Sequence, residues 1–161
     1  MQIRTATIAD LEKIAEVEAI CFPPTEAASK EEFAKRLQIY PEHFWLLEND
    51  GKLISFINGM VTDEMTIRDE MFADANLHSP TGAWQAIFGV NTLPEYRCKG
   101  YAAMIMRHVI EEARRQGRAG LILTCKAEKI AYYQKFGYEI LGVSKSVHGD
   151  AVWYDAILRF S

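Results

Sequence analysis

Apolar residues recur along the chain with two different spacings, and these spacings predict where helices and strands lie. The clearest helix spans residues 100–116, where apolar side chains return every three or four positions. Its apolar stripe consists of Ala102, Ile105, Met106, Val109, Ile110 and Ala113. Gly117 follows as the expected residue after the last turn. Continuous apolar runs at 83–90 and 120–125 predict buried strands on either side of this helix.

Two helix starts and one hairpin can be located in the first half of the chain. Thr7 with Asp10, and Ser29 with Glu32, have the spacing of a capping box, in which two side chains satisfy free amides at a helix start. Each pair therefore predicts that a helix begins directly after it. Asn49-Asp50-Gly51 lies between two apolar runs and predicts a tight hairpin.

The remaining patterns complete the order of elements. A short first strand is expected at 3–7, a loop with a short helix at 63–77, a helix at 129–136, and a C-terminal hairpin around His148-Gly149-Asp150. The order β-α-α-β-β-β-α-β-α-β-β predicts an α/β (α+β) fold, with a mixed, mostly antiparallel sheet and helices on its faces. The 161 residues contain no linker-like segment, so we expect a single domain over 1–161.

Composition narrows the classes of function. The formal net charge is −4, which argues against a general nucleic-acid binder because such a protein needs a broad basic surface. No apolar run approaches the length of a membrane span, and no signal-peptide pattern opens the chain. The 3 cysteines are far apart and lack metal-ligand spacing. We therefore expect a cytoplasmic protein without a membrane segment, disulfide framework or metal.

The charged junction before the 100–116 helix has two readings. Arg97, Lys99 and Gly100 sit between a strand and a helix, followed only by small residues. A helix N-terminus has free backbone N–H groups and a partial positive charge, which suit a phosphate. An exposed, charged turn would have the same composition. Neither the Walker A pattern nor the GxGxxG fingerprint is present.

Family resemblance favours the phosphate site. Arg97-x-x-Gly100-x-Ala102 resembles the pyrophosphate loop of the GNAT superfamily of N-acetyltransferases. "AYYQKFGYE" at 131–139 is similar to the same family's Tyr-x-x-x-Gly-Phe/Tyr segment, through Tyr133, Gly137 and Tyr138. The segments "FINGMVTDE", "LHSPTG", "LTCKAE" and "YYQKFGY" also resemble the arylalkylamine (serotonin) N-acetyltransferase branch, in the same order.

This resemblance implies the GNAT fold, with acetyl-CoA as co-substrate and no metal. In the family, a splayed strand lends free backbone groups to the pantetheine arm, and that strand matches Phe88, Gly89 and Val90; an ordinary core strand would explain the apolar residues equally well. The loop that would surround the pyrophosphate comprises Arg97, Cys98, Lys99, Gly100, Tyr101, Ala102 and Ala103.

Tyr133 matches the residue that the family uses as general acid toward the departing thiolate. A phenol is a weaker acid than a thiol, so full proton transfer would be uphill by about 2 kcal/mol. Donation of a hydrogen bond to the developing charge remains favourable. The alternative role for Tyr133 is a packed aromatic beside Tyr132 and Phe136.

The sequence leaves several candidates for the group that accepts the proton of the amine. The arylalkylamine branch has two histidines on the strand before the cofactor loop, but this chain has Trp84 and Ala86 at those positions. His78 is the nearest histidine in sequence, and an imidazole has a suitable pKa for a base. It could also be a loop histidine without a role. A water chain to solvent or to Asp63 or Glu64 would serve as well.

The resemblance also implies a substrate loop at "CFPPTE", residues 21–26. These residues could equally be no more than a connection between two helices. The candidate substrate-binding residues are Phe22, Pro24, Trp84, Phe88 and Thr124. We expect acetyl transfer to a primary amine, with a small arylalkylamine as acceptor and a monomer or homodimer as the assembly. A polyamine attracted by the acidic residues of 63–74, a peptide acceptor, and a non-catalytic CoA-binding module are the alternatives; that acidic run could equally be a solvated face.

Overall fold

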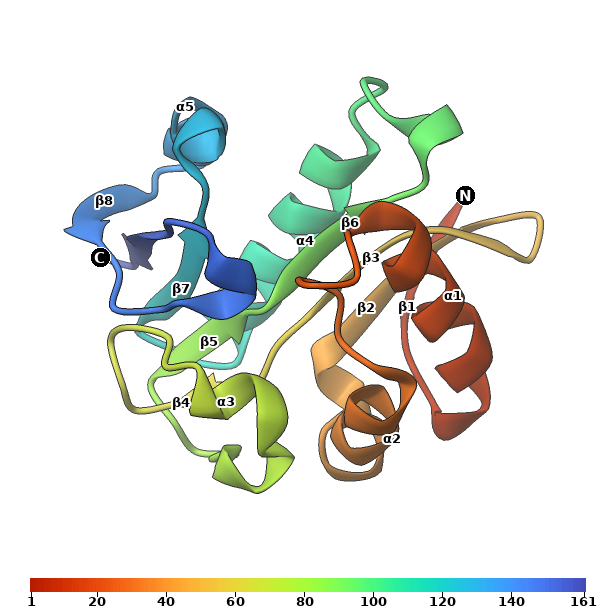
Figure 1. Ribbon diagram of the computed structural model, residues 1–161, viewed down its shortest axis with the longest axis horizontal. Helices are drawn as coiled ribbons and strands as arrows, with labels where there is room; N and C mark the ends of the chain where they lie inside the picture. Colours follow the sequence, from red (N-terminus) through yellow and green to blue (C-terminus); the bar gives the residue numbers. More distant parts are fainter.

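The computed structural model describes all residues, 1–161 (Figure 1). The helices are α1 (Leu11–Cys21), α2 (Lys30–Ile39), α3 (Glu70–Ala73), α4 (Tyr101–Arg115) and α5 (Ile130–Gln134). The strands are β1 (Gln2–Thr5), β2 (Phe44–Asn49), β3 (Lys52–Asn58), β4 (Val61–Thr62), β5 (Trp84–Ile87), β6 (Gly89–Thr92), β7 (Gly120–Cys125), β8 (Glu139–Val143) and β9 (Tyr154–Arg159). None of the helices combines the length and the apolar character needed to cross a bilayer.

The strands form two sheets, with orders β1-β2-β3-β6 and β4-β5-β7-β9-β8. Every strand pair is antiparallel except β5 with β7, which is parallel. The crossover between β5 and β7 passes through β6 and α4. The expected mixed, mostly antiparallel arrangement is therefore confirmed.

Helices cover both faces of the first sheet, and the alternation of side chains along β2 explains why. Phe44 and Leu46 are buried in the cluster that also contains residues of α1 and α2. Trp45 and Leu47 are buried in a second cluster, which contains the apolar stripe of α4. Successive strand residues point to opposite faces, so a strand that is apolar at every position needs cover on both. Figure 1 shows α1 and α2 on one side of the strands and α4 on the other.

The local signals for helix starts and for the first hairpin are confirmed. Both capping boxes form: the side chain of Asp10 accepts from the amide of Thr7, and the side chain of Glu32 accepts from that of Ser29. At the hairpin between β2 and β3, Asp50 and Gly51 have φ values of 50° and 79°. Positive φ at both central residues is typical of the tight turn that matches strand twist.

One strand prediction needs correction. The apolar run at 83–90 was expected to form a single strand, but the chain breaks at Phe88 into β5 and β6. Ile87 is the last residue of β5 to pair with β7, whereas Gly89 already pairs with Asn58 of β3. The two halves hydrogen-bond to different sheets, so the strand direction changes between them. Apolar character alone carries no information about this change of partner.

Candidate active site

The break at Phe88 opens a gap between the two sheets. β6 is the edge strand of its sheet and pairs only with β3, while β7 continues past its pairing with β5 to Thr124 and Cys125. The side of β6 that faces β7 therefore has no strand partner. Such an edge offers free N–H and C=O groups to an extended amide ligand. The expected residues Phe88, Gly89 and Val90 lie at this edge.

A groove of about 530 Å³ runs from this gap to the N-terminus of α4. Cys98 and Gly100 both have positive φ, 60° and 86°, which turns the loop sharply into the helix. The first helical hydrogen bond joins the amide of Met104 to the carbonyl of Gly100, so the preceding amides have no helical partner. The groove is lined by six of the seven expected loop residues, namely Arg97, Cys98, Gly100, Tyr101, Ala102 and Ala103.

The two cations of this loop lie at its sides. The Nε of Arg97 donates to the carbonyl oxygen of Thr92 at 2.9 Å. Lys99 does not line the groove; its ammonium lies 5.9 Å from the ring centre of Tyr96. Arg97, Lys99 and the free amides of α4 place positive charge beside the groove, although the chain as a whole has a negative net charge.

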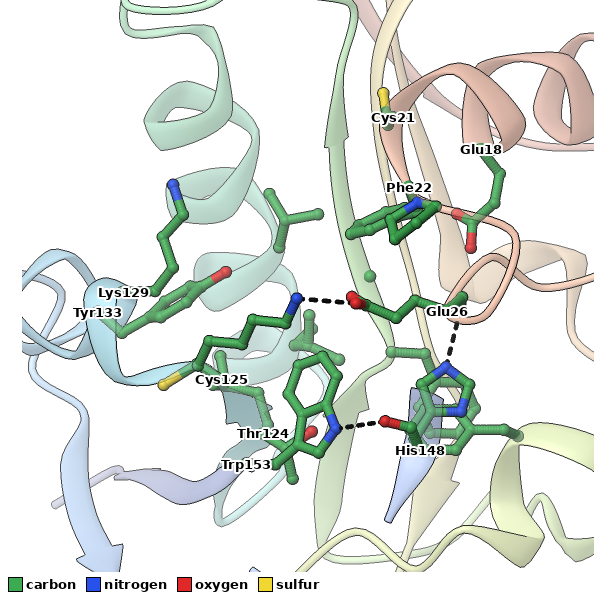
Figure 2. Close-up of a pocket in the computed structure, with 18 of the residues that line it drawn as sticks. Glu18, Cys21, Phe22, Glu26, Thr124, Cys125, Lys129, Tyr133, His148 and Trp153 are labelled. Carbon is green, nitrogen blue, oxygen red and sulfur yellow. Dashed lines mark hydrogen bonds and ion pairs between the residues drawn. The ribbon is translucent and has the colours of Figure 1, made fainter. Parts of the chain in front are cut away.

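Tyr133 connects this groove with a second, deeper cavity of about 300 Å³. It lies on α5, between the rings of Tyr132 and Tyr138, with centroids 5.2 and 5.8 Å away. Its hydroxyl points toward the cavity in Figure 2. Burial raises the pKa of Tyr133 above its ordinary value, and the nearby Tyr132 and Cys125 add to this effect. The phenol therefore stays protonated at neutral pH and can donate a hydrogen bond into the cavity.

The far rim of the cavity joins the expected substrate loop to residues that the sequence did not assign to the site. The Nε2 of His148 donates to the carbonyl oxygen of Glu26 at 2.8 Å, and the Nε1 of Trp153 donates to that of His148 at the same distance (Figure 2). Lys126 pairs with the carboxylate of Glu26 at 2.8 Å. The loop between β8 and β9 thus closes onto the loop between α1 and α2. Only this long-range contact brings the rim together, so spacing along the chain carries no trace of it.

Glu18 was not among the expected site residues, because its position on α1 fits an ordinary helical pattern. Its side chain lines the cavity wall opposite Tyr133 (Figure 2), and the residue is only 6% exposed. Oε2 accepts the amide N–H of Ala28 at 2.9 Å, whereas Oε1 is buried without a hydrogen-bond partner. Burial raises the pKa of this carboxyl, against the lowering influence of the Ala28 amide and of Arg36.

The sequence profile of the Acetyltransferase (GNAT) family matches residues 11–138 of the chain. The chain belongs to this family. Human (Homo sapiens) N-acetyltransferase 8 is 26% identical over 104 residues, which are 63% of this chain and 40% of that protein. The chain therefore matches well under half the length of this curated relative.

Solved structures agree on the GNAT fold. The GphF GNAT-like decarboxylase in complex with isobutyryl-CoA is 20% identical with a TM-score of 0.82, and the match covers 99% of both chains. Arabidopsis thaliana Naa50, in complex with the bisubstrate analogue CoA-Ac-MVNAL, is 16% identical with a TM-score of 0.76; the match covers 99% of this chain and 98% of Naa50. At such low identity, these likenesses establish the fold alone.

Within this GNAT fold, three of the five expected substrate-binding residues meet at the cavity. Phe22, Phe88 and Thr124 all line it. Pro24 is exposed and does not line it, whereas the neighbouring Pro23 does. Trp84 is buried in the core against Gly120 and does not reach the cavity. The latter two positions therefore receive no support from the geometry.

His78 lies outside the cavity as well. Its Nδ1 accepts the amide N–H of Val61 at 3.0 Å, and its ring lies 4.8 Å from that of Tyr40. Burial, together with the nearby His43 and Arg118, lowers the pKa of His78 to about 4. It is thus neutral at pH 7, but it lines neither the cavity nor the groove, so the geometry does not support it as the expected base.

The imidazole of His78 also belongs to a group with Glu42 and His43, whose potential metal-ligand atoms lie within 4.8 Å of one another. Gln85 uses its amide nitrogen on backbone carbonyls, so its oxygen must accept from Nδ1 of His43. The Val61 contact places the remaining proton of neutral His78 on Nε2. Of the two histidines, only His43 keeps a free lone pair, on Nε2. A metal ion would therefore find few ligands here, and the two histidines are better explained as packed rings.

Acidic residues of 63–74 hydrogen-bond to other parts of the protein, and none of them lines the cavity. Asp63 accepts the amide of Ala83, and Asp74 caps the turn at Asn76. Asp69 accepts from Ser146 and from the amide of Val147, which anchors the loop between β8 and β9. These contacts explain the acidic run without a cationic ligand.

Proposed function

We propose that this protein is an acetyl-CoA-dependent N-acetyltransferase acting on a primary amine, with a small arylalkylamine as the acceptor. The observation that carries the proposal is the position of Tyr133. It stands where the groove of the α4 loop meets the cavity beside the splayed strand edge. The thioester of acetyl-CoA bound along the groove would reach this junction, with the amine arriving from the cavity.

The residues present fit acetyl-CoA. The free amides at the start of α4 and the side chain of Arg97 would hold the pyrophosphate. The open edge of β6 at Gly89 and Val90 would pair with the amides of the pantetheine arm. When bound, acetyl-CoA supplies an activated carbonyl and a thiolate leaving group. No metal enters this assignment.

In this proposal, Tyr133 donates a hydrogen bond to the sulfur atom of the thioester. As the amine nitrogen bonds to the carbonyl carbon and the carbon–sulfur bond breaks, negative charge develops on sulfur. A hydrogen bond from the Tyr133 hydroxyl stabilises that charge in the transition state. Since burial raises the pKa of Tyr133, complete proton transfer is less favourable than for a free phenol, and hydrogen-bond donation is its main contribution.

The walls of the cavity support an acceptor with an apolar body. Aromatic side chains from four separate elements or loops line it, namely Phe22, Phe72, Phe88 and Trp153. Aromatic walls bury apolar surface and tolerate a flat ring. A long polyamine has no flat apolar body to bury against these rings, which favours the arylalkylamine over the polyamine alternative.

Free-thiol release from acetyl-CoA tests the proposal. The acceptors would be phenethylamine, tryptamine, spermidine and a short peptide with a free N-terminus, each over a range of concentrations. We expect turnover with the two arylalkylamines at a kcat/KM at least about tenfold above the others, equivalent to about 1.4 kcal/mol. Preference for the peptide or spermidine would reassign the acceptor. Acetyl-CoA binding without turnover on any amine would favour a non-catalytic module.

A further inference from the structure

Oε1 of Glu18 has no hydrogen-bond partner, and the residue lines the acceptor cavity. On the proposed function, we infer that Glu18 binds the ammonium group of the acceptor and takes its proton before the amine attacks the thioester. The proton passes from the amine nitrogen to Oε1, which leaves the nitrogen lone pair free for the carbonyl carbon. Glu18 is then the proton acceptor that the missing strand histidines do not supply.

The two carboxylate oxygens of Glu18 differ in their hydrogen bonding. Oε2 is held by the amide of Ala28, which fixes the orientation of the carboxylate. Oε1 is buried without a partner. An unpartnered charged oxygen inside a protein is costly, so such an atom is expected to meet a ligand. A protonated amine is the partner that best compensates a buried carboxylate.

Glu18 also lies close to the strand break. A Cβ placed on Gly89 would be 3.9 Å from Oε1 of Glu18 and 3.4 Å from Nδ2 of Asn91. These are ordinary contact distances, so Oε1 of Glu18 lies close to the backbone of β6 at Gly89, against which the thioester is proposed to lie. Tyr133 stands on the opposite wall (Figure 2). The proton acceptor and the hydrogen-bond donor would therefore flank the reacting carbonyl from two sides.

The other charges around Glu18 leave Oε1 available. On α2, Arg36 directs its two terminal nitrogens to Oδ1 of Asn58 and to the carbonyl of Phe72. Glu26 is paired with Lys126, and His148 donates to the backbone of Glu26. Of the remaining neighbours, Glu32 on α2 and Cys21 on α1 also face this region. Asn91 lies close enough to lower the pKa of Glu18, but no hydrogen bond joins its amide group or any of these other groups to Oε1.

A route for the proton continues behind Glu18. A small cavity of about 30 Å³ is bordered by Glu18, Glu32, Arg36 and Asn58. This volume suits about one water molecule, and its walls are polar enough to hold one. Glu32 lies at the start of α2 and is partly exposed. A proton taken up by Glu18 can therefore leave toward solvent without crossing the acceptor cavity.

The test compares Glu18→Gln with Glu16→Gln in the full-length protein. Glutamine keeps an oxygen for the Ala28 amide but cannot take up a proton. Glu16 lies two residues earlier on α1 and is exposed, so its variant makes the same change of charge without touching the cavity. The measurements are kcat on phenethylamine from pH 5 to 9, acetyl-CoA affinity, and melting temperature.

We expect Glu18→Gln to lower kcat about 100-fold, within the range for loss of a general base, with acetyl-CoA affinity unchanged within about twofold. In the wild type, kcat falls as pH drops through the raised pKa of Glu18, and the variant loses this acidic limb. A raised carboxyl pKa destabilises the fold above that pKa, so the variant should melt no lower than the wild type at pH 7. Unchanged kcat with an unchanged acidic limb would overturn the inference and leave the proposed function standing.

A binding measurement separates the inference from turnover. Calorimetry with CoA-saturated protein would compare phenethylamine with phenethyl alcohol, which lacks the charge. We expect Glu18→Gln to weaken phenethylamine at least about tenfold and to leave the alcohol unchanged. If the wild type binds phenethylamine in this way without acetylating any amine, the proposed function fails and the ammonium site stands. Equal loss for both ligands, or no binding of the amine by the wild type, contradicts the site.

Discussion

Tyr133 and Tyr138 show how neighbouring phenols in one aromatic cluster come to differ. The hydroxyl of Tyr138 is buried and donates to Sδ of Met106 at 3.5 Å, deep in the core beneath α4. The hydroxyl of Tyr133 instead faces the cavity. Burial raises the pKa of both. Both phenols therefore stay protonated at neutral pH, and they differ in what they can reach.

This difference gives a prediction at the residue scale. Tyr133→Phe should lower kcat by about 100-fold or more, because it removes the donor aimed at the developing thiolate. Acetyl-CoA affinity should change by no more than about twofold. Tyr138→Phe removes a hydroxyl from the same cluster and should affect melting temperature more than turnover. Steady-state kinetics and thermal melts of both variants decide the matter; similar kinetic effects would argue for a packing role of Tyr133.

At the scale of elements, both ends of α4 depend on a glycine with positive φ. Gly100 has a φ of 86° before the first turn, and Gly117 has a φ of 80° after the last. A Cβ at either position would meet nothing within 4 Å. Replacement by alanine therefore costs backbone strain and causes no collision. Only the N-terminal glycine borders the groove.

This symmetry provides a matched pair of variants. Gly100→Ala and Gly117→Ala should each lower the free energy of unfolding by about 1–2 kcal/mol, the cost of the left-handed conformation for a residue with a Cβ. Gly100→Ala alone should weaken acetyl-CoA binding, by about tenfold, because strain there reorients the amides that would hold the pyrophosphate. Urea unfolding and calorimetric titration measure the two effects. Equal affinities for both variants would remove the α4 loop from the proposed binding site.

At the scale of the whole molecule, Arg4 joins three parts of the chain. Its guanidinium on β1 contacts Asp10, at the start of α1, and Glu48 on β2, at 2.7 Å each. The hydrogen bond from Arg4 lowers the pKa of Asp10 below its ordinary value. A lowered carboxyl pKa contributes stability above the ordinary pKa, and this contribution is lost as pH falls through the lower, folded value.

Arg4→Met should therefore destabilise the protein by about 1–2 kcal/mol at pH 7, as expected for partly exposed charged hydrogen bonds. The difference from wild type should be constant between pH 7 and 5. It should shrink below the ordinary Asp10 pKa of 3.8, where Asp10 of the unfolded chain takes up a proton while Asp10 of the folded wild type still resists protonation. Lys30→Met, which removes an exposed ion pair with Glu12, serves as the comparison and should change stability little. Urea unfolding at pH 7, 5 and 3 measures both; a difference that grows toward pH 3 would contradict the assigned role.

The local parts of the fold followed from the sequence. The capping boxes, the hairpin at Asp50-Gly51 and the stripe of α4 each depend on residues within a few positions of one another. The Arg97 loop and Tyr133 were likewise expected at the site because each belongs to a short motif at the edge of one helix, and both line the groove. The break at Phe88 was indicated only by the family resemblance, as a splayed strand at Phe88, Gly89 and Val90. The apolar pattern could not show it, because the break results from pairing of Gly89 with Asn58 and of Ile87 with Leu123, which are 31 and 36 positions away.

The sequence by itself determined the elements and the family of the chain, because periodicity, caps and short motifs act over a few residues. The tertiary structure alone decided which side chains meet at the cavity. It excluded His78, Pro24 and Trp84 and brought in Glu18, together with His148, which contacts a loop 122 positions earlier. A contact of that range leaves no spacing in the sequence. The burial that leaves Oε1 of Glu18 without a partner exists only after α1, α2 and the two sheets have packed together.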